Sequence, residues 1–235
     1  MQLVIANKNY SSWSLRPWVL MKHFGISFEE IHIWLGQDDT AQQILAYSPS
    51  GRIPCLIDEN RRSIWDSLAI AETLAERFPQ HALWPRDDVA RAHARSVSAE
   101  MHSSFSALRN EMPMKIRSVL PGLDFTPEAL ADVARIDAIW RECLHQYRGP
   151  FLFGEFSIAD AMFAPVVMRF NTYSPALSPE AAAYVAHLTA QPAMQVWIYD
   201  AQVEGHAIAR YEGDTDPVAQ PVANPVTSAV TSAAP

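Results

Sequence analysis

The first part of the chain alternates short apolar runs with polar loops. Residues 3–6 form an apolar run followed by polar residues, which predicts a buried strand and then a loop. A helix should come next, because Ser14 can cap it, Pro17 can occupy its first turn and Gly25 can end it. Residues 28–34 alternate in part and predict a second strand. Two strands that flank a helix form a βαβ unit with parallel strands.

A second set of elements completes this region. Residues 40–46 predict a short helix, and the run Ser-Pro-Ser-Gly at 48–51 is typical of a turn. Residues 53–58 and 63–65 predict two antiparallel strands joined by a turn. A helix is expected over 67–78, where apolar residues recur every three or four positions. The first eighty or so residues therefore predict a thioredoxin-like order, βαβ, helix, ββα.

The pattern changes near residues 83–87, where we expect a linker. Beyond it no strand-like alternation occurs, and prolines and glycines separate four expected helices, over 88–111, 127–148, 157–171 and 179–203. We therefore expect an α/β domain over 1–80 and an all-helical domain over 88–210. Residues 213–235 are rich in Pro, Ala, Val, Thr and Ser without an amphipathic period, which predicts a disordered tail.

Composition narrows the classes of function. The 235 residues are 49% hydrophobic, enough for one large core or two modest ones. A net charge of −8 argues against a nucleic-acid partner, since phosphate binding needs clustered Lys and Arg. The first apolar run is too short for a signal peptide and no stretch could span a membrane, so we expect a cytoplasmic protein without a membrane partner. Cys55 and Cys143 form no zinc pattern, so no metal is expected and both cysteines should serve packing.

Pro54 stands at the opening of an expected strand, in the run Ser-Gly-Arg-Ile-Pro, where a proline has no N–H for the ladder. One interpretation is a cis peptide bond that turns the amide and carbonyl of Ile53 outward, to pair with an extended ligand. The alternative is a trans proline at a strand edge.

Asp66 and Ser67, in the run Trp-Asp-Ser-Leu-Ala-Ile, lie where a strand meets a helix. Free amides and the positive end of the helix dipole would face a bound carboxylate there, and Asp66 could accept a hydrogen bond from an ammonium group. Such a site suits the terminus of an α-amino acid. The alternative is that one of the two residues only caps its own helix.

Together these motifs resemble the thioredoxin-like domain of the cytosolic glutathione transferases, and the resemblance extends over about residues 1–210. It implies glutathione as co-substrate, with the backbone of Ile53, next to Pro54, pairing with its cysteinyl part. Asp66 and Ser67 would hold its γ-glutamyl end. It also implies a homodimer in which one α/β domain meets the helices of the partner.

The run Ser-Ser-Trp-Ser-Leu-Arg after the first strand is similar to the Ser-Ser-x-Ser-x-Arg element of the zeta class, the maleylacetoacetate isomerase group. That match implies Ser11 as the group that activates the sulfur, with Ser12 as substitute and Tyr10 as rival. Trp13 stands where zeta enzymes have cysteine, which leaves the isomerase reaction open. Arg16 either closes an ion pair across the fold or lies near the site. A hydroxyl and a helix N-terminus could lower a thiol pKa by about 1 to 2.

The second domain holds two further candidates. His102, Phe105 and Arg109 should share one helix face, since steps of three and four do so, and would suit an electrophile with a carboxylate. The alternative is a core phenylalanine beside solvated charges. Ser157 and Asp160 precede an apolar helix with the spacing of a capping box and are assigned to folding.

We expect an enzyme whose glutathione thiolate attacks a small electrophile, and conjugation, isomerisation and dehalogenation all remain open. Two other classes of function are less consistent with the sequence. A non-catalytic binding module of the same fold is less consistent with the intact set of ligand-binding residues. A thiol-disulfide oxidoreductase would need a cysteine in the first loop, which has none.

Overall fold

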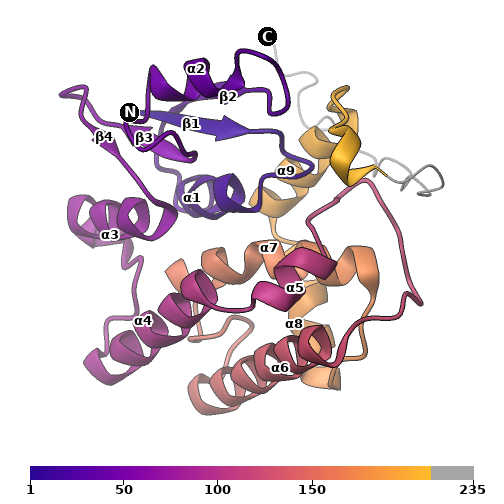
Figure 1. The fold of residues 1–235 in the computed structure, drawn as a ribbon. Helices are drawn as coiled ribbons and strands as arrows, with labels where there is room; N and C mark the ends of the chain where they lie inside the picture. Colours follow the sequence, from indigo (N-terminus) through magenta and orange to yellow (C-terminus); the bar gives the residue numbers. More distant parts are fainter. Residues whose placement is uncertain (213–235) are drawn as a thin grey trace, which may run out of the picture.

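The computed structural model describes residues 1–212 (Figure 1). The strands lie in its N-terminal part and helices form the remainder, so the expected fold class, an α/β domain followed by a helical domain, is confirmed. Within the described residues, none of the helices is long and apolar enough to cross a membrane. The tail expected at 213–235 lies outside the described residues.

A four-stranded sheet organises the α/β domain, in the order β2-β1-β3-β4. The strand β1 is parallel to β2, whereas β3 is antiparallel to both β1 and β4. The expected strands are all present. The strand β1 (Gln2–Ala6) is one residue longer than expected, whereas β2 (Glu29–Ile33), β3 (Cys55–Ile57) and β4 (Ser63–Ile64) are shorter.

Different helices cover the two faces of the sheet (Figure 1). Successive side chains of a strand point to opposite faces, so Leu3 and Ile5 of β1 join the main core, whereas Val4 joins a small cluster with Cys55. The main core lies on the side of α1 (Ser12–His23) and α3 (Ser67–Arg77), and the small cluster includes Ile44 of α2 (Thr40–Leu45). The expected packing role of Cys55 is thus confirmed.

Helix α1 begins three residues earlier than expected. Its N-cap is Ser11, and Ser14 lies inside the helix, so the expected capping role of Ser14 is wrong. The Ser14 hydroxyl instead accepts a hydrogen bond from the amide of Ala6 at 3.1 Å, which ties the helix to the end of β1. Pro17 consequently lies beyond the first turn. The early start brings Ser11 to the point where the loop meets the helix.

Two of the four expected helices are divided. The range 88–111 breaks at Phe105, whose φ of 65° is left-handed, and 179–203 breaks before Pro192, which opens the next helix because its missing N–H is not needed there. The helices are α4 (Asp88–Ser103), α5 (Ser106–Glu111), α6 (Pro127–Tyr147), α7 (Ile158–Tyr173), α8 (Pro179–Thr189) and α9 (Pro192–Val203). Two short 3-10 turns occur at Pro79–His81 and Ala209–Tyr211.

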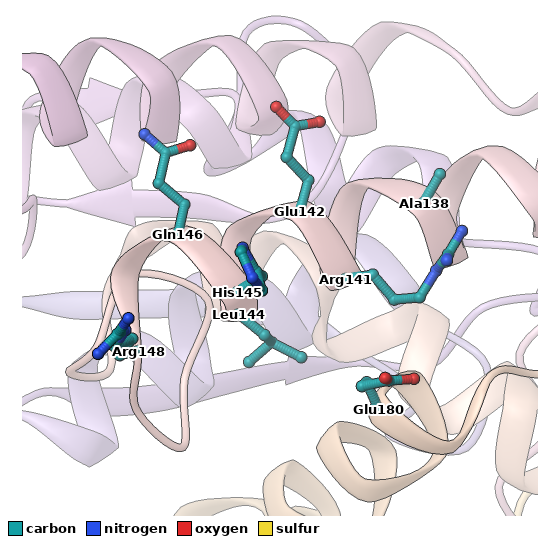
Figure 2. A pocket seen from close by; sticks show the side chains of 8 residues that line it. All are labelled: Ala138, Arg141, Glu142, Leu144, His145, Gln146, Arg148 and Glu180. Atoms are coloured by element: carbon teal, nitrogen blue, oxygen red, sulfur yellow. The ribbon is translucent and has the colours of Figure 1, made fainter.

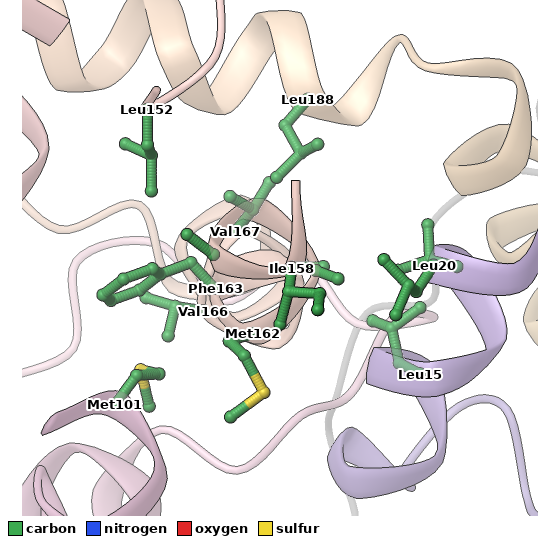
Figure 3. Packing of buried hydrophobic residues seen from close by; sticks show 14 of the residues in the cluster. Leu15, Leu20, Met101, Leu152, Ile158, Met162, Phe163, Val166, Val167 and Leu188 are labelled. Atoms are coloured by element: carbon green, nitrogen blue, oxygen red, sulfur yellow. The ribbon is translucent and has the colours of Figure 1, made fainter. Parts of the chain in front are cut away.

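Helix α7 forms the centre of the core. Every residue of this helix except Asn171 is buried, and it packs on α1, α4 and α8. Figure 3 shows α7 surrounded by side chains of these helices, among them Leu15, Leu20, Met101 and Leu188. Because α1 packs directly on α7, the helical domain holds in place the helix that follows Ser11.

The capping box expected at the start of α7 is confirmed. The Ser157 amide donates to the Asp160 carboxylate at 2.9 Å, and the Ser157 hydroxyl accepts from the first turn of the helix. Asp160 is completely buried and also accepts from the Leu152 amide and the Tyr184 hydroxyl, each at 3.0 Å. Burial raises the pKa of Asp160 to about 6, against the effect of these hydrogen bonds.

Candidate active site

A cavity of about 610 Å³, named here the Asp66 cavity, lies at the edge of the α/β domain, next to α4. It brings together the four residues expected to bind glutathione, although they come from two separate loops. Its lining consists of Trp13, Ile44, Ser50, Arg52, Ile53, Pro54, Trp65, Asp66, Ser67 and His102.

The peptide bond between Ile53 and Pro54 is cis, so the alternative of a trans proline is wrong. Within residues 1–212, no hydrogen bond uses the amide or the carbonyl of Ile53, although the next strand residue, Cys55, is paired with Val4 of β1. The backbone of Ile53 thus has both a donor and an acceptor for an extended ligand in the Asp66 cavity.

Asp66 caps α3, as the alternative interpretation held. Its Oδ1 accepts from the Leu68 amide at 3.0 Å and from the Ala69 amide at 3.5 Å. Its Oδ2 lies 3.1 Å from Nε2 of His102, and the side chain is 53% exposed. A carboxylate offers about four lone-pair directions, so Asp66 can cap the helix and still accept from a ligand ammonium group.

Arg16 lies deeper, behind the wall that Trp13 and Ser67 form in the Asp66 cavity. Nη1 of Arg16 lies 3.4 Å from the Ser67 hydroxyl, and the Arg16 guanidinium stacks over the Trp13 ring at 4.2 Å. Arg16 is only 2% exposed, and its Nε and Nη2 have no hydrogen-bond partner among the described residues. Burial lowers the pKa of Arg16, and repulsion from Arg109 and Arg169 adds to this effect. Arg16 therefore lies near the site.

A second cavity, of about 300 Å³ and named here the Ser11 cavity, shares Trp13 and Ile53 with the first. It contains the serines expected to activate the sulfur. The full lining is Tyr10, Ser11, Ser12, Trp13, Leu35, Ile53, Arg109, Pro113, Met114, Arg169 and Tyr211.

Ser11 is the N-cap of α1, yet its side chain makes no capping bond to the helix. Its hydroxyl donates to the Ser14 oxygen at 2.7 Å. Ser12 is the first residue of the helix, and both serines are nearly buried, at 9% and 7% exposure. The first amides of a helix lack intrahelical partners and carry the positive end of its dipole. An anionic sulfur at this point would meet backbone amides, and the Ser11 hydroxyl would donate to it by turning away from Ser14, which is a neutral acceptor.

The hydroxyl of Tyr10, the rival residue, is already engaged. It donates to the Glu212 carboxylate and accepts from Arg117 at 2.9 Å and from the Ile208 amide at 3.3 Å. Burial and the bond to Glu212 both raise the pKa of Tyr10. A hydroxyl that already donates to a carboxylate is a poor donor to a second anion.

The residues expected to contact the second substrate do not share one helix face, and that expectation is wrong because the chain breaks at Phe105. Phe105 belongs to the core at 5% exposure. His102 lines the Asp66 cavity, whereas Arg109 lines the Ser11 cavity. The Arg109 guanidinium lies 5.0 Å from the Trp13 ring centre and donates from Nε to the Ser104 carbonyl at 3.0 Å.

Comparison with known proteins agrees with this architecture. Residues 10–77 match the model of the glutathione S-transferase N-terminal domain, and residues 90–188 match that of the C-terminal domain. Glutathione S-transferase GstB of Escherichia coli is 30% identical over 166 residues, which are 64% of this chain and 75% of that protein. The chain belongs to the glutathione S-transferase family.

Other members of this glutathione S-transferase family are similar to the chain in sequence and in structure. A probable maleylacetoacetate isomerase of Caenorhabditis elegans is 26% identical over 176 residues, 72% of this chain and 78% of that protein. A glutathione transferase homologue from Burkholderia, solved with bound glutathione, superposes with a TM-score of 0.65 at 26% identity. The superposition covers 84% of this chain and 95% of the Burkholderia chain.

Residues distant in sequence from the serines hold the first loop of this glutathione S-transferase family member. The Glu204 carboxylate accepts from the amides of Lys8 at 2.7 Å and Asn9 at 3.1 Å, and the Trp197 indole donates to the Lys8 carbonyl at 3.0 Å. Sequence analysis missed these residues and also missed Arg169. Nothing local marks Glu204, which lies 195 positions from Asn9.

A cavity larger than either of these lies elsewhere, along α6. Figure 2 shows its lining, with Arg141, Glu142 and His145 on α6 and Glu180 on α8. It measures about 930 Å³ and includes none of the expected site residues. Volume alone is thus a poor guide to the site of this family member.

The described part of the chain shows neither a reactive cysteine nor a metal site. Both cysteines are buried and free, and burial raises the pKa of Cys55 and brings that of Cys143 to about 12. Such thiols are seldom ionised at neutral pH. Over residues 1–212, no group of three or more His, Cys, Asp and Glu side chains could hold a metal ion.

Proposed function

We propose that this family member is a glutathione transferase in which the hydroxyl of Ser11 holds the glutathione sulfur as a thiolate that attacks a small electrophile. One observation carries the proposal: the uncapped start of α1, with Ser11 and Ser12, lies in a cavity that shares Ile53 with the cavity of Asp66 and Ser67. The similarity to a homologue solved with bound glutathione supports this ligand.

The two cavities suit the two ends of glutathione. In the Asp66 cavity the half-exposed carboxylate of Asp66 accepts from the γ-glutamyl ammonium, and the α3 N-terminus with Ser67 receives its carboxylate. The amide and carbonyl of Ile53 pair with the cysteinyl backbone. Because Ile53 lines both cavities, the adjacent sulfur reaches the Ser11 cavity and the Ser11 hydroxyl.

The chemistry needs a thiolate at neutral pH. A free thiol with a pKa near 8.5 is only a few per cent ionised there, whereas a hydrogen bond to a charged group contributes about 1.5–3 kcal/mol. The hydroxyl and the amides of α1 therefore lower the thiol pKa by about 1 to 2. The thiol proton leaves to solvent, the sulfur lone pair forms a C–S bond, and the leaving group departs with the electrons of its own bond.

Isomerisation is the second candidate, favoured by the similarity to maleylacetoacetate isomerases, which includes one of Pseudomonas aeruginosa at 31% identity over 113 residues. Here the thiolate adds to a conjugated double bond, the resulting single bond rotates, and the C–S bond breaks again to return the thiolate. Trp13, in place of the zeta-class cysteine, lines both cavities and favours conjugation.

Several wider expectations belong to the same proposal. They are a homodimer, a cytoplasmic location, the absence of a metal cofactor, and domain limits at 1–80 and 88–210. A non-catalytic binding module is the contrary proposal. Retention on immobilised glutathione separates the two, because a module that lacks the ligand site would pass through the column.

The decisive experiment titrates the thiolate absorbance of the protein–glutathione complex against pH. We expect an apparent thiol pKa about 1 to 2 below that of free glutathione, and a return toward the free value in Ser11→Ala. The exposed Ser96→Ala on α4 is the matched control and should leave the titration unchanged. An unshifted thiol pKa in the unaltered protein would contradict the proposal, and loss of the shift in Ser12→Ala alone would assign the role to Ser12.

A further inference from the structure

The Ser11 cavity is basic although the chain as a whole is acidic. Two guanidinium groups, from Arg109 of α5 and Arg169 of α7, line it, and no Asp or Glu among residues 1–212 belongs to its lining. Arg16 lies behind Trp13 and adds a third cation to the same region. This concentration of positive charge contrasts with a net charge of −8 for the chain.

Arg169 is buried with most of its donors unused. It is 4% exposed, and Nη1 donates to the Met112 carbonyl. Across residues 1–212 no ion pair joins it to a carboxylate, and no other hydrogen bond involves its side chain. A guanidinium group carries five N–H donors in a rigid fork that matches a carboxylate, so Arg169 can bind an anion with the remaining ones.

Arg109 is held at the Ser11 cavity by contacts that leave its charge without a partner. Its Nε and Nη2 donate to the carbonyls of Ser104 and Met101, and its face lies against Trp13, on which Arg16 also stacks. Asp132 is the carboxylate that influences it, but this residue accepts from the Leu108 amide at 3.0 Å. The carbonyls and the Trp13 ring therefore fix the position of the guanidinium group.

Arg169 remains charged at neutral pH. Burial, followed by repulsion from Arg109, lowers the pKa of Arg169 to about 10, still well above neutrality. Buried charge without a counter-ion is costly, and neighbouring like charges increase the cost. An anionic ligand would offset this cost, whereas a neutral ligand would leave the guanidinium groups desolvated and unpaired.

We propose that the electrophile carries a carboxylate, which Arg109 and Arg169 bind in the Ser11 cavity. This inference rests on the proposed function, because it names the substrate class of the same site. Ser11 and Ser12 line the same cavity, so one small molecule can reach both the sulfur and the guanidinium groups. A volume of about 300 Å³ lies at the lower end of ligand pockets, which favours a small acid.

The test compares para-chloro-meta-nitrobenzoate with its methyl ester. Each kcat/KM is divided by the rate constant of the uncatalysed reaction with glutathione, because the ester group activates the ring more strongly than the carboxylate does. In both, the thiolate forms a C–S bond at the carbon that bears chlorine, and chloride leaves with the bonding electrons. We expect kcat/KM for the acid to exceed that for the ester by about 10-fold or more, because charge-assisted hydrogen bonds form only with the acid.

The variants Arg169→Met and Arg109→Met should each remove about 10-fold from kcat/KM for the acid and change that for the ester by less than about threefold. The matched control is Arg141→Met, on α6 at the cavity of Figure 2, where Arg141 pairs with Asp137 at 2.9 Å. It should leave both values unchanged. Equal turnover of acid and ester, or equal losses for both in the two variants, would overturn the inference and leave the proposed function intact.

A binding measurement separates this inference from the thiolate mechanism. Calorimetric titration with the two glutathione conjugates, acid and methyl ester, measures the preference for the carboxylate without any turnover. Tighter binding of the acid that is lost in the arginine variants supports the anion site even if no electrophile reacts, an outcome that would refute only the proposed function. Because Arg169 is buried, circular dichroism checks folding, and Arg169→Lys, which keeps the charge, should retain part of the preference.

Discussion

The two domains treat buried carboxylates differently. In the α/β domain the buried carboxylate of Asp58 is paired with Arg62 at 2.7 Å and Arg77 at 2.6 Å. In the helical domain α7 carries Asp160 near one end and Arg169 toward the other, both buried. The donors to Asp160 are neutral groups, and the acceptor for Arg169 is a backbone carbonyl.

This difference separates buried charges that have a counter-charge within the fold from buried charges that have only neutral partners. The Asp58 carboxylate is neutralised by two arginines of its own domain, so it needs no ligand. A buried charge with neutral partners is stabilised by taking up a proton, in the case of Asp160, or by binding an anion, in the case of Arg169. The proposed binding of a carboxylate thus depends on a helix that carries a buried guanidinium group without a carboxylate partner among the described residues.

The largest expected effect is a pH dependence of stability at Asp160. Its folded-state pKa of about 6 lies above the ordinary 3.8, so its contribution to stability is present below about pH 4 and is lost as the pH rises through about 6. The free energy of unfolding, relative to Asp160→Asn, should fall by up to about 3 kcal/mol over this window. Chemical denaturation of both proteins between about pH 4 and pH 7 measures it.

Asp58 is the matched control with the opposite sign. The amide of Arg62, with the guanidinium groups of Arg62 and Arg77, holds the pKa of Asp58 well below its usual range. Its contribution is therefore present above about pH 4 and is lost at lower pH. If the difference curve for Asp160→Asn has the same sign as that for Asp58→Asn, the hydrogen bonds to Asp160 outweigh its burial and the contrast between the domains is wrong.

A smaller effect is expected from Asp66→Asn in the Asp66 cavity. Asparagine caps a helix as well as aspartate does, so stability should change by less than about 0.5 kcal/mol. The charge that receives the γ-glutamyl ammonium is lost, so KM for glutathione should rise about 5- to 10-fold with little change in kcat. Steady-state kinetics at varied glutathione concentration tests this expectation.

Asp87→Asn provides the control for Asp66→Asn. Asp87 caps α4 through the Ala90 amide at 2.8 Å and does not line the Asp66 cavity. This variant makes the same chemical change at another cap and should leave KM for glutathione unaltered. An equal rise in KM in both variants would mean that Asp66 acts only through the helix.

The smallest effect is expected from Tyr10→Phe, at the junction of the two domains. The hydroxyl belongs to a network with Glu212 and Arg117, so kcat/KM should fall by less than about threefold, whereas stability should fall by about 1 kcal/mol. Thermal denaturation and steady-state kinetics measure the two effects. A loss beyond about 10-fold in Tyr10→Phe, with near-normal Ser11→Ala, would make Tyr10 the activating residue.

The parts of the site that were predicted well are contiguous in sequence. Ile53 with Pro54, and Asp66 with Ser67, are neighbours along the chain, and the box of Ser157 and Asp160 spans one helical turn. Their geometry follows from local backbone rules. The prediction that His102, Phe105 and Arg109 share one helix face was wrong, because Phe105 has a left-handed backbone conformation and the helix ends before it. Helical periodicity does not reveal such a residue.

By itself the sequence determined the order of strands and helices, the two motifs expected to bind glutathione and the serines near the start of α1, since each depends on residues a few positions apart. Only the tertiary structure decided that Arg109 and Arg169 line the same cavity as Ser11, and that Glu204 fastens the loop before α1. The physical reason is that such contacts depend on how α7 packs against α1 and how α9 returns to the loop after β1, and no local pattern specifies the packing of distant helices.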